Sequence, residues 1–492
     1  MTGITECCEN ATVDYDITII GAGISGINTA YRIQTELPNK SWTILEARDS
    51  IGGTWDLFRY PGIRSDSDLH TFGFAWRPWD STKPIADGDS ILSYMKDCAN
   101  AENISDNIQF RRQVDSLNWS SKASCWSLSV TRTGETSSTR TITTRWVVFG
   151  TGYYSYQNAM PAMIPGIESF EGTVIHPQFW PADFDYTGKR IVIIGSGATA
   201  ITLLPALAEK ASHVTMLQRT PTFILSQPET DALDVLIRKI FPRAIASKLI
   251  RLRWIFTTLL FFKYCRAFPN TSRKWLLSET NKQLPSHIPV VPHFDPPYNP
   301  WEQRLCTCPA GDFYKSLSDG KGSVVTGHID MIDGNAIHLK DSKEALHPDV
   351  IVTATGLNVQ LFGGAHITID NEKIDLGLKH AWRGAMVEGI PNAVVMIGYT
   401  NASWTLGADV NATVMVRIMK RMDAKGATSV TPTASEQLAD TPLLNLNSTY
   451  LNRVQKDLPK AGNRGPWKPR IDYWKDVWTA KFGSLRDGLQ YV

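Results

Sequence analysis

The sequence DITII at residues 16–20 leads directly into GAGISG at residues 21–26. A short apolar, β-branched run, a GxGxxG turn and a helical pattern are together typical of the strand, turn and helix that bind a dinucleotide. Gly21 permits the tight turn, Gly23 lets the backbone approach a pyrophosphate, and Gly26 lets the helix pack on the strand. Free N–H groups at the start of the helix can then hold the phosphates. This stretch predicts a first nucleotide site.

The chain beyond this turn supplies the acid that such a site uses. A second apolar run at residues 42–45 ends at Glu46, where a carboxylate can hold the ribose hydroxyls of an adenine nucleotide. A GxGxxG pattern alone occurs by chance. The strand before it and the acid at the correct distance after it favour a functional site.

The same pattern occurs a second time, with a different ending. RIVII at residues 190–194 runs into GSGATA, and another apolar run follows at 213–217. The residues of this second turn are Gly195, Ser196, Gly197, Ala198, Thr199 and Ala200. Neutral Gln218 takes the place of Glu46, and Arg219 follows it. Losing a carboxylate and gaining a guanidinium suits a ribose with a 2′-phosphate. We therefore expect FAD at the first site and NADPH at the second; the alternative for Arg219 is an exposed cation at a strand end.

The order of these patterns predicts the domain organisation. A chain of 492 residues favours two or more domains. A β-meander is expected at 108–145, and VVFGTG at 147–152 and DVIVTATG at 349–356 each end in Thr-Gly, which suits a crossing between domains beside a nucleotide. We expect an α/β fold with two Rossmann-like dinucleotide-binding domains, the second inserted into the first. The expected parts are an FAD-binding domain (1–152 and 349–492), an NADP-binding domain (153–227 and 301–348) and a basic helical insertion (228–300).

The composition argues against several classes of function. Fifty Lys and Arg against 48 Asp and Glu give a net charge of +2, so no global charge favours nucleic acid. The seven cysteines are scattered and form no paired CxxC motifs, so neither a disulfide framework nor a metal site is expected. The first fifteen residues lack the basic start and apolar run of a signal peptide. A reducing, cytoplasmic location is expected.

Residues 235–278 carry ten basic side chains and no acidic one. A basic, aromatic-rich helical stretch can lie on an anionic membrane surface or carry a partner helix. The longest uncharged apolar run in it, residues 254–262, is too short to span a bilayer. The alternative, which the sequence slightly favours, is an insertion packed on the body of the protein with its cationic face in water.

Two longer strings narrow the class of protein. Disulfide reductases also stack two dinucleotide folds, but they need a dithiol after the first turn, and no cysteine occurs between Cys8 and Cys98. FEGTVIHPQFWP at 170–181 fits FxGxxxHxxxWP, and GGTWDLFRYPGIRSD at 52–66 fits GGTWxxxRYPGxxxD. The matching residues of the first string are Phe170, Gly172, His176, Trp180 and Pro181. With these strings the sequence resembles the flavin-dependent Baeyer-Villiger monooxygenases, a group of class B flavoprotein monooxygenases. It is most similar to the branch of the ethionamide-activating monooxygenase, through RSDSD, HPQFWP, PYNPWEQRLC and GYTNASWTL.

The resemblance implies roles for particular residues. It places a catalytic cation at Arg304 with Asp66 paired to it, and it puts Gln303 where relatives commonly carry a lysine. His176 would be a catalytically important hydrogen-bonding switch in the linker into the NADPH domain rather than a base. Residues implied to line the flavin and the nicotinamide are Gly53, Thr54, Trp55, Arg64, Ser65 and Asp66. Val114 would offer its backbone to the adenine of FAD, and residues 401–404 (NASW) would form part of the substrate pocket or, alternatively, an ordinary turn.

The resemblance also implies the reaction. FAD and NADPH would support insertion of one oxygen atom from O2 into a ketone, through a C4a-peroxyflavin, to give an ester or lactone. The cation at Arg304 would stabilise the anionic peroxide and adduct. One alternative is oxygenation of a sulfide or an amine by the same intermediate. Another is a flavin-binding NADPH oxidase, or a redox partner, that forms no organic product.

Overall fold

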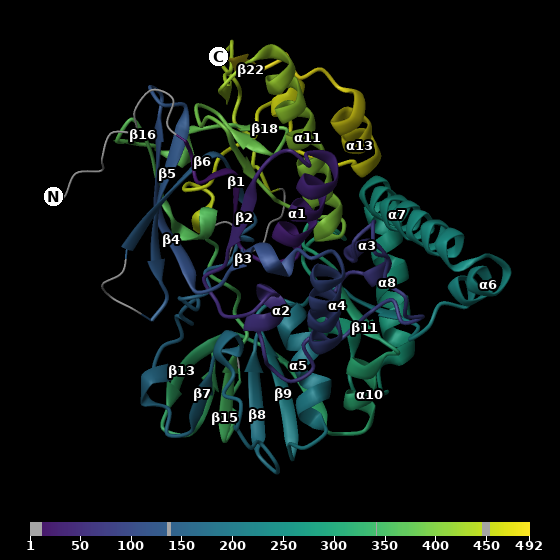
Figure 1. Ribbon diagram of the computed structural model, residues 1–492. Helices are drawn as coiled ribbons and strands as arrows, with labels where there is room; N and C mark the ends of the chain where they lie inside the picture. The colour runs from purple at the N-terminus through teal and green to yellow at the C-terminus, as the bar shows by residue number, and fades with distance from the viewer. Residues whose placement is uncertain (1–11, 135–138, 341, 445–452) are drawn as a thin grey trace.

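The computed structural model describes residues 12–134, 139–340, 342–444 and 453–492. Cys7, Cys8 and most of the N-terminal segment considered above lie outside these ranges. Two sheets lie one below the other, and a group of helices, α6 to α8, stands to one side of both (Figure 1). We therefore expect the two nucleotide sites where the two sheets meet.

The upper sheet has a parallel core around β1 (Tyr15–Ile20), whose last four residues are buried. β1 pairs with β2 (Trp42–Leu45) on one side and with β6 (Thr139–Phe149) on the other. β3 (Ile108–Gln109) extends the sheet beyond β2, and β20 (Ala393–Val395) pairs with β6. The helix α1 (Ile24–Glu36) follows β1 directly. The strand, turn and helix expected from DITII and GAGISG are therefore present.

The same sheet continues as an antiparallel meander. The first half of β6 pairs with β5 (Cys125–Arg132), and β5 pairs with β4 (Arg112–Ser120). β16 (His366–Ile369) joins β4 from much later in the chain, and β17 (Glu372–Lys373) pairs with it. The meander expected at 108–145 is therefore found, and it shares one sheet with the nucleotide-binding core.

The lower sheet is entirely parallel. Its order is β12 (Gly322–Thr326), β9 (His213–Gln218), β8 (Arg190–Ile194), β15 (Val350–Thr353) and β7 (Thr173–Ile175). The helix α5 (Ala198–Ala208) follows β8 as α1 follows β1, and α10 (Asp312–Ser318) packs against α5. The expected start of the second FAD-binding part at residue 349 is wrong, because β15 belongs to the lower sheet. β15 pairs with β8 and β7, because a fully apolar VIVT strand is best buried between two parallel neighbours; the chain returns to the upper sheet only after it.

Most of the basic segment is helical and leaves the lower sheet between β9 and β12. It is bracketed by β10 (Ile224–Gln227) and β11 (Cys306–Pro309), which pair in parallel. Its helices are α6 (Ala232–Ile240), α7 (Arg243–Ala267), α8 (Pro269–Gln283) and α9 (Val290–His293). The shorter elements that complete the first half are α2 (Thr54–Leu57), α3 (Leu69–Phe72), α4 (Gly88–Ala101) and the 3-10 helix η3 (Pro177–Phe179).

The C-terminal part packs back on the upper sheet. The long helix α11 (Trp404–Lys425) lies against α1, where the guanidinium of Arg32 on α1 makes two 2.9 Å contacts with the carboxylate of Asp409 on α11. A bidentate, half-buried pair of this kind fixes the relative position of two helices. The remaining elements are β13 (Ile329–Asp333), β14 (Ala336–Leu339), β18 (Ala381–Trp382), β19 (Met386–Val387), β21 (Val430–Pro432), α13 (Tyr473–Phe482) and β22 (Leu489–Tyr491).

Candidate active site

Each glycine-rich turn lies against the segment that crosses between the domains. Gly21 has a φ of +100°, and a Cβ there would lie 2.9 Å from the carbonyl oxygen of Gly150, at the end of β6. Gly195 has a φ of +138°, and a Cβ there would lie 2.2 Å from the carbonyl oxygen of Ala354, just after β15. A side chain at either position would push the crossing segment away. Both Thr-Gly segments thus reach the two turns, as expected.

The helices after both turns begin without a side-chain cap. Gly23 precedes α1 and Gly197 precedes α5, and neither helix start has a capping hydrogen bond from a side chain. The first N–H groups of these helices are free to bind a phosphate. Gly26 is required because a Cβ there would lie 1.9 Å from the carbonyl oxygen of Gly21; at the second turn Ala200 takes this third position and is fully buried. The donor set fits a pyrophosphate at both turns.

Glu46 lies directly beside the first turn. Its Oε2 accepts a hydrogen bond of 2.6 Å from the backbone N–H of Ala22, and its Oε1 accepts one of 2.9 Å from the N–H of Arg48. Burial raises the pKa of this carboxyl, and the two backbone donors oppose that shift. The backbone also connects Glu46 to β4, because its carbonyl accepts from the N–H of Arg112, two residues before buried Val114. Adenosine contacts by Glu46 and Val114 fit this placement and stay a prediction.

The GGTW string lies across the first turn. Gly53 has a φ of +56°, and a Cβ there would lie 3.2 Å from the Cα of Gly23. The Thr54 hydroxyl lies 3.2 Å from the hydroxyl of Tyr156, and the Trp55 ring meets the Phe72 ring edge-on at 5.7 Å. Because neither Gly23 nor Gly53 has a side chain, both backbone segments can approach the pyrophosphate of a flavin. Flavin binding by Gly53, Thr54 and Trp55 stays a prediction.

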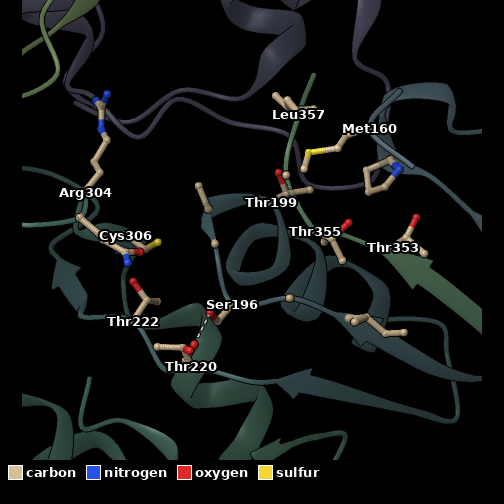
Figure 2. Close-up of a pocket in the computed structure, with 18 of the residues that line it drawn as sticks. Met160, Ser196, Thr199, Thr220, Thr222, Arg304, Cys306, Thr353, Thr355 and Leu357 are labelled. Atoms are coloured by element: carbon tan, nitrogen blue, oxygen red, sulfur yellow. Dashed lines mark hydrogen bonds between the residues drawn. The ribbon is translucent and has the colours of Figure 1, made fainter. Parts of the chain in front are cut away.

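One cavity of about 670 Å3 connects the second turn with residues of the upper domain. Asp66, His176, Arg219, Arg304 and the turn residues Gly195–Thr199 all line it. Met160 and Leu357 from the linkers line it, and Thr199 and Ser196 line it from the second turn (Figure 2). The Ser196 hydroxyl donates a 2.6 Å hydrogen bond to the carbonyl of Thr220, which fixes the second turn to the chain after β9 (Figure 2). The cavity is therefore shared by both domains.

Arg304 reaches from the lower domain toward the upper one (Figure 2). Its Nη2 donates a 2.8 Å hydrogen bond to the hydroxyl of Ser67. The expected ion pair with Asp66 is not formed: among the described residues, no carboxylate oxygen lies within 4.0 Å of the Arg304 guanidinium. Burial raises the pKa of Asp66, and the charges of Arg304 and Arg64 oppose that shift without direct contact. Ser67, which sequence reasoning missed, is the residue that positions Arg304.

Two other residues of the RSDSD string are used differently from the expectation. Arg64 forms an ion pair with Asp312 at the start of α10, in which Nη2 lies 3.3 Å from Oδ1, and it does not line the cavity. Ser65 is buried, and its hydroxyl donates a 2.7 Å hydrogen bond to the carbonyl of Ser67. Ser65 thus fixes the loop that carries Ser67, the hydrogen-bond partner of Arg304. Arg64 ties the same loop to the lower domain through Asp312. Contact of Arg64 and Ser65 with a nicotinamide stays a prediction.

Gln218 and Arg219 have separate tasks. Gln218 is buried, and its amide nitrogen donates to the carbonyl of His293 at 2.6 Å and to the hydroxyl of Thr326 at 3.0 Å. It does not line the cavity, so the contacts of Gln218 give no support to its expected role at the second nucleotide site. Arg219 is exposed and lines the cavity, together with His328 and Lys340. Three basic side chains thus surround the end of β9, where a 2′-phosphate is expected.

The string FEGTVIHPQFWP fixes the linkers between the domains. Gly172 is required because a Cβ there would lie 2.6 Å from the Phe170 ring and from the carbonyl of Asp349. His176 lines the cavity, its Nδ1 accepts from the N–H of Gln178 at 3.2 Å, and its buried Nε2 has no hydrogen-bond partner in the part of the chain that the structure describes. Burial lowers its pKa, and the nearby Gly356 backbone opposes the shift.

Gln178, in the same string, makes a direct side-chain contact between the two linkers. The Gln178 side chain is buried, and its amide nitrogen donates to the carbonyl of Ser155 at 2.7 Å and to that of Tyr156 at 3.3 Å. These carbonyls belong to the linker that follows the first crossing segment. The role of His176 as a hydrogen-bonding switch stays a prediction, and the direct side-chain contact between the linkers is made by Gln178. Buried amides that bond only to backbone leave no sequence signal beyond the glutamine itself.

The NASW segment divides between two cavities. Trp404 lines the main cavity, stacks on Tyr153 at 4.9 Å, and donates a 2.8 Å hydrogen bond to Ser25 in the first turn. Asn401 instead donates to the carbonyl of Ile471 at 2.9 Å. Asn401, Ala402 and Ser403 line a small crevice against α7. Of the four residues, only Trp404 is placed to contact a substrate in the main cavity.

Two nucleotide turns with uncapped helix starts, the second of which lines a cavity shared by both domains, and no dithiol after the first turn indicate a flavoprotein that also takes a second nucleotide. The family model of the flavin-binding monooxygenase-like proteins (FMO-like) matches residues 14–258. The FAD-containing monooxygenase EthA of Mycobacterium tuberculosis (strain CDC 1551 / Oshkosh) is 42% identical over 484 residues, which is 98% of this chain and 98% of that protein.

Solved structures agree at the level of the fold. OTEMO in complex with FAD and NADP matches with a TM-score of 0.73 at 20% identity, over 98% of this chain and 100% of that one. Oxidized steroid monooxygenase bound to NADP matches with a TM-score of 0.75 at 20% identity, over 97% and 99%. The chain belongs to the flavin-binding monooxygenase family, as its resemblance predicted. The α/β fold is confirmed, and the flavin-binding family and its 42% identical FAD-containing member support the expected pair of FAD and NADP(H).

Proposed function

We propose that this protein is an NADPH-dependent Baeyer-Villiger monooxygenase. A ketone, O2, NADPH and one proton give an ester or lactone, NADP+ and water. The bound flavin, reduced by NADPH, supplies the activation of O2. The cavity shared by both domains then has to bind the acceptor, exclude water and stabilise negative charge that develops on oxygen.

The observation that carries this proposal is the state of Arg304. Its guanidinium lines the shared cavity, and among the described residues it hydrogen-bonds to a neutral hydroxyl and to no carboxylate. A guanidinium has five N–H donors, so most remain available for an anionic oxygen. Asp66 is close enough to influence the field and is not in contact. Ketone oxygenation builds such an anion, whereas transfer of oxygen to a sulfide does not require one.

Substrate competition is the direct test. The FAD-loaded enzyme is given NADPH, 18O2 and, in separate reactions, a cyclic, an aliphatic and an aryl ketone or a thioether. We expect lactones or esters that carry one labelled oxygen, with product formed in proportion to NADPH consumed. Sulfoxide without any ester would replace the proposal by heteroatom oxygenation. Hydrogen peroxide as the sole product would identify an NADPH oxidase.

Arg304→Ala separates the role of the cation from that of the fold. Because we propose that Arg304 stabilises the anionic adduct, the variant should still accept hydride from NADPH while its rate of ester formation falls by about 100- to 1000-fold, as for the loss of one oxyanion donor. Ser67→Ala is the matched control for positioning. It removes only the 2.8 Å contact, and we expect a smaller loss. Full lactone formation by Arg304→Ala would contradict this assignment.

A further inference from the structure

Most large apolar side chains that are exposed on the described part of the chain lie on one side of the molecule. Sixteen of the twenty-three belong to residues 233–275 or to residues 471–482. Those on α6 and α7 are Leu233, Leu236, Ile240, Ile245, Leu249, Leu252, Phe256, Leu260 and Tyr264. α13 adjoins α7, since Lys263 on α7 and Asp472 before α13 form a 2.6 Å ion pair (Figure 1). We call the surface of α6, α7 and α13 the apolar face.

The outer side of α7 has a regular apolar stripe. Residues 245, 249, 252, 256 and 260 follow at intervals of three or four, which places them along one side of the helix over about 22 Å. The inner side is formed by other residues, including Ala246, Ile250 and Ile255, which are buried against the protein. Packing against the protein therefore explains why the inner residues of α7 are apolar, but it does not explain the apolar residues on the outer side. Continuous exposed apolar patches of this kind mark interaction surfaces.

The basic residues of the insertion divide into two groups. Four point into the protein: Arg238 and Arg251 donate to backbone carbonyls, and Arg253 and Arg273 pair with Asp234 and Asp295. This group bears out the packed interpretation of part of the segment. The other basic side chains, Lys239, Arg243, Lys248, Lys263, Arg266 and Lys274, are exposed. Arg243 pairs with Asp80 at 2.7 Å and Lys263 with Asp472 at 2.6 Å, whereas Lys239, Lys248, Arg266 and Lys274 form no ion pair within the described ranges.

α13 has the same character as α7. Trp474, Trp478 and Phe482 are exposed at intervals of four, with Lys475 and Lys481 exposed beside them. No acidic side chain of residues 471–482 is classed as exposed. Tryptophan and lysine side by side suit the boundary between water and lipid, because the ring prefers the interface and the ammonium can reach the headgroups.

We propose that the apolar face docks on an anionic lipid surface. The stripe of α7 and the aromatic rings of α13 would enter the headgroup boundary, and the exposed lysines and arginines would bind the lipid phosphates. Attachment is peripheral, since no helix in the described ranges has the length and apolarity to cross a membrane. A second copy of the chain fits less well, because the same face would present the same positive charge to itself.

Vesicle flotation of the FAD-loaded protein tests this. We expect the protein to float with vesicles of equal parts phosphatidylcholine and phosphatidylglycerol at low ionic strength, and less with pure phosphatidylcholine or with added salt. Each lysine or arginine near an anionic surface strengthens binding about fivefold. The variant Lys239→Gln/Lys248→Gln/Arg266→Gln should therefore bind about 100-fold more weakly. The matched control Lys122→Gln/Lys343→Gln changes exposed lysines outside the apolar face and should bind as the parent does.

A second variant, Leu252→Ser/Phe256→Ser, tests the apolar contribution at positions that are 49% and 57% exposed. We expect it to lose vesicle binding while it keeps bound flavin and the parent rate of NADPH oxidation, which shows that the fold is intact. Failure of the parent protein to float, or equal binding to neutral vesicles, would overturn the proposal. A lipid-free dimer that this variant dissociates, without vesicle binding by the parent, would assign the face to a second copy instead.

Discussion

Arg219 should determine the preference for NADPH over NADH. It lies directly after β9, is exposed, and lines the cavity beside the second turn. Gln303 also lines the cavity and has no charge. We therefore expect the binding of a 2′-phosphate to depend on Arg219 and on His328 and Lys340, which line the same cavity. Arg219→Ala removes the one side chain of the three that can form two parallel hydrogen bonds to a phosphate.

The size of the effect follows from the kind of contact. A hydrogen bond to a charged group contributes about 1.5–3 kcal/mol, which is a factor of about 10 to 150 in affinity. Because Arg219 is exposed to solvent, we expect the lower part of this range for NADPH. NADH lacks the 2′-phosphate, so its kcat/KM should change by less than about twofold, an effect within the range of ordinary surface substitutions. Lys340→Ala should show the same selectivity with a smaller loss.

Initial rates of NADPH and NADH oxidation, measured over a range of each nucleotide, give the two kcat/KM values. Arg190→Ala is the matched control, because Arg190 is an exposed arginine at the opposite end of the same sheet, where it pairs with Asp349 at 3.0 Å. Its NADPH to NADH ratio should equal that of the parent. If Arg219→Ala lowered kcat/KM equally for both nucleotides, Arg219 would be only a cation at a strand end.

Three further outcomes follow from the linkers and from α3. His176→Ala should lower oxygenation with flavin still bound, because its ring lines the cavity and contacts no part of the first turn in the described residues. Gln178→Leu should lower the free energy of unfolding by about 1–3 kcal/mol, because it leaves the Ser155 carbonyl unsatisfied. Denaturant titration measures this loss, and an unchanged stability would contradict the role of Gln178 in joining the linkers. Burial raises the pKa of Asp68 to about 6, so the stability from this group is complete below its unfolded pKa and is lost as the pH rises through about 6. The melting temperature of Asp68→Asn should therefore fall less than that of the parent between pH 4.5 and pH 6.5, and parallel curves would exclude the shift.

The sequence predicts those parts of the site that depend on the backbone. GAGISG and GSGATA require specific φ values and close approaches, so the glycines themselves reveal the turns and the crossing segments. Contacts between distant side chains are different. The pairing of Arg64 with Asp312 and of Arg304 with Ser67 joins residues more than 200 positions apart, and either arginine could reach Asp66 as far as spacing alone shows. The sequence likewise does not determine which sheet β15 joins, because an apolar strand fits the parallel part of either sheet.

The two strings that identify the family mainly hold the domains together. Gly53 packs on the first turn, while Gly62, in the same string, packs on α5 of the lower domain. A Cβ at Gly62 would lie 2.6 Å from the Cβ of Ala206 and 2.9 Å from the carbonyl of Thr202. Gly62→Ala should therefore move the loop that carries Asp66 and Ser67 away from Arg304. We expect flavin binding to persist and the fraction of NADPH converted to hydrogen peroxide instead of product to rise.

Gly188 offers a control that separates this contact from backbone strain. Its φ of +68° is close to the +75° of Gly62, but a Cβ at Gly188 would meet nothing within 4 Å. Gly188→Ala thus carries the same cost of an alanine in the left-handed region, about 1–2 kcal/mol, without the clash. Product and peroxide formed per NADPH are measured for both variants. Because only Gly62 touches the other domain, only Gly62→Ala should lose coupling; equal coupling in the two variants would show that the distance between the domains at this point does not control the fate of the activated oxygen.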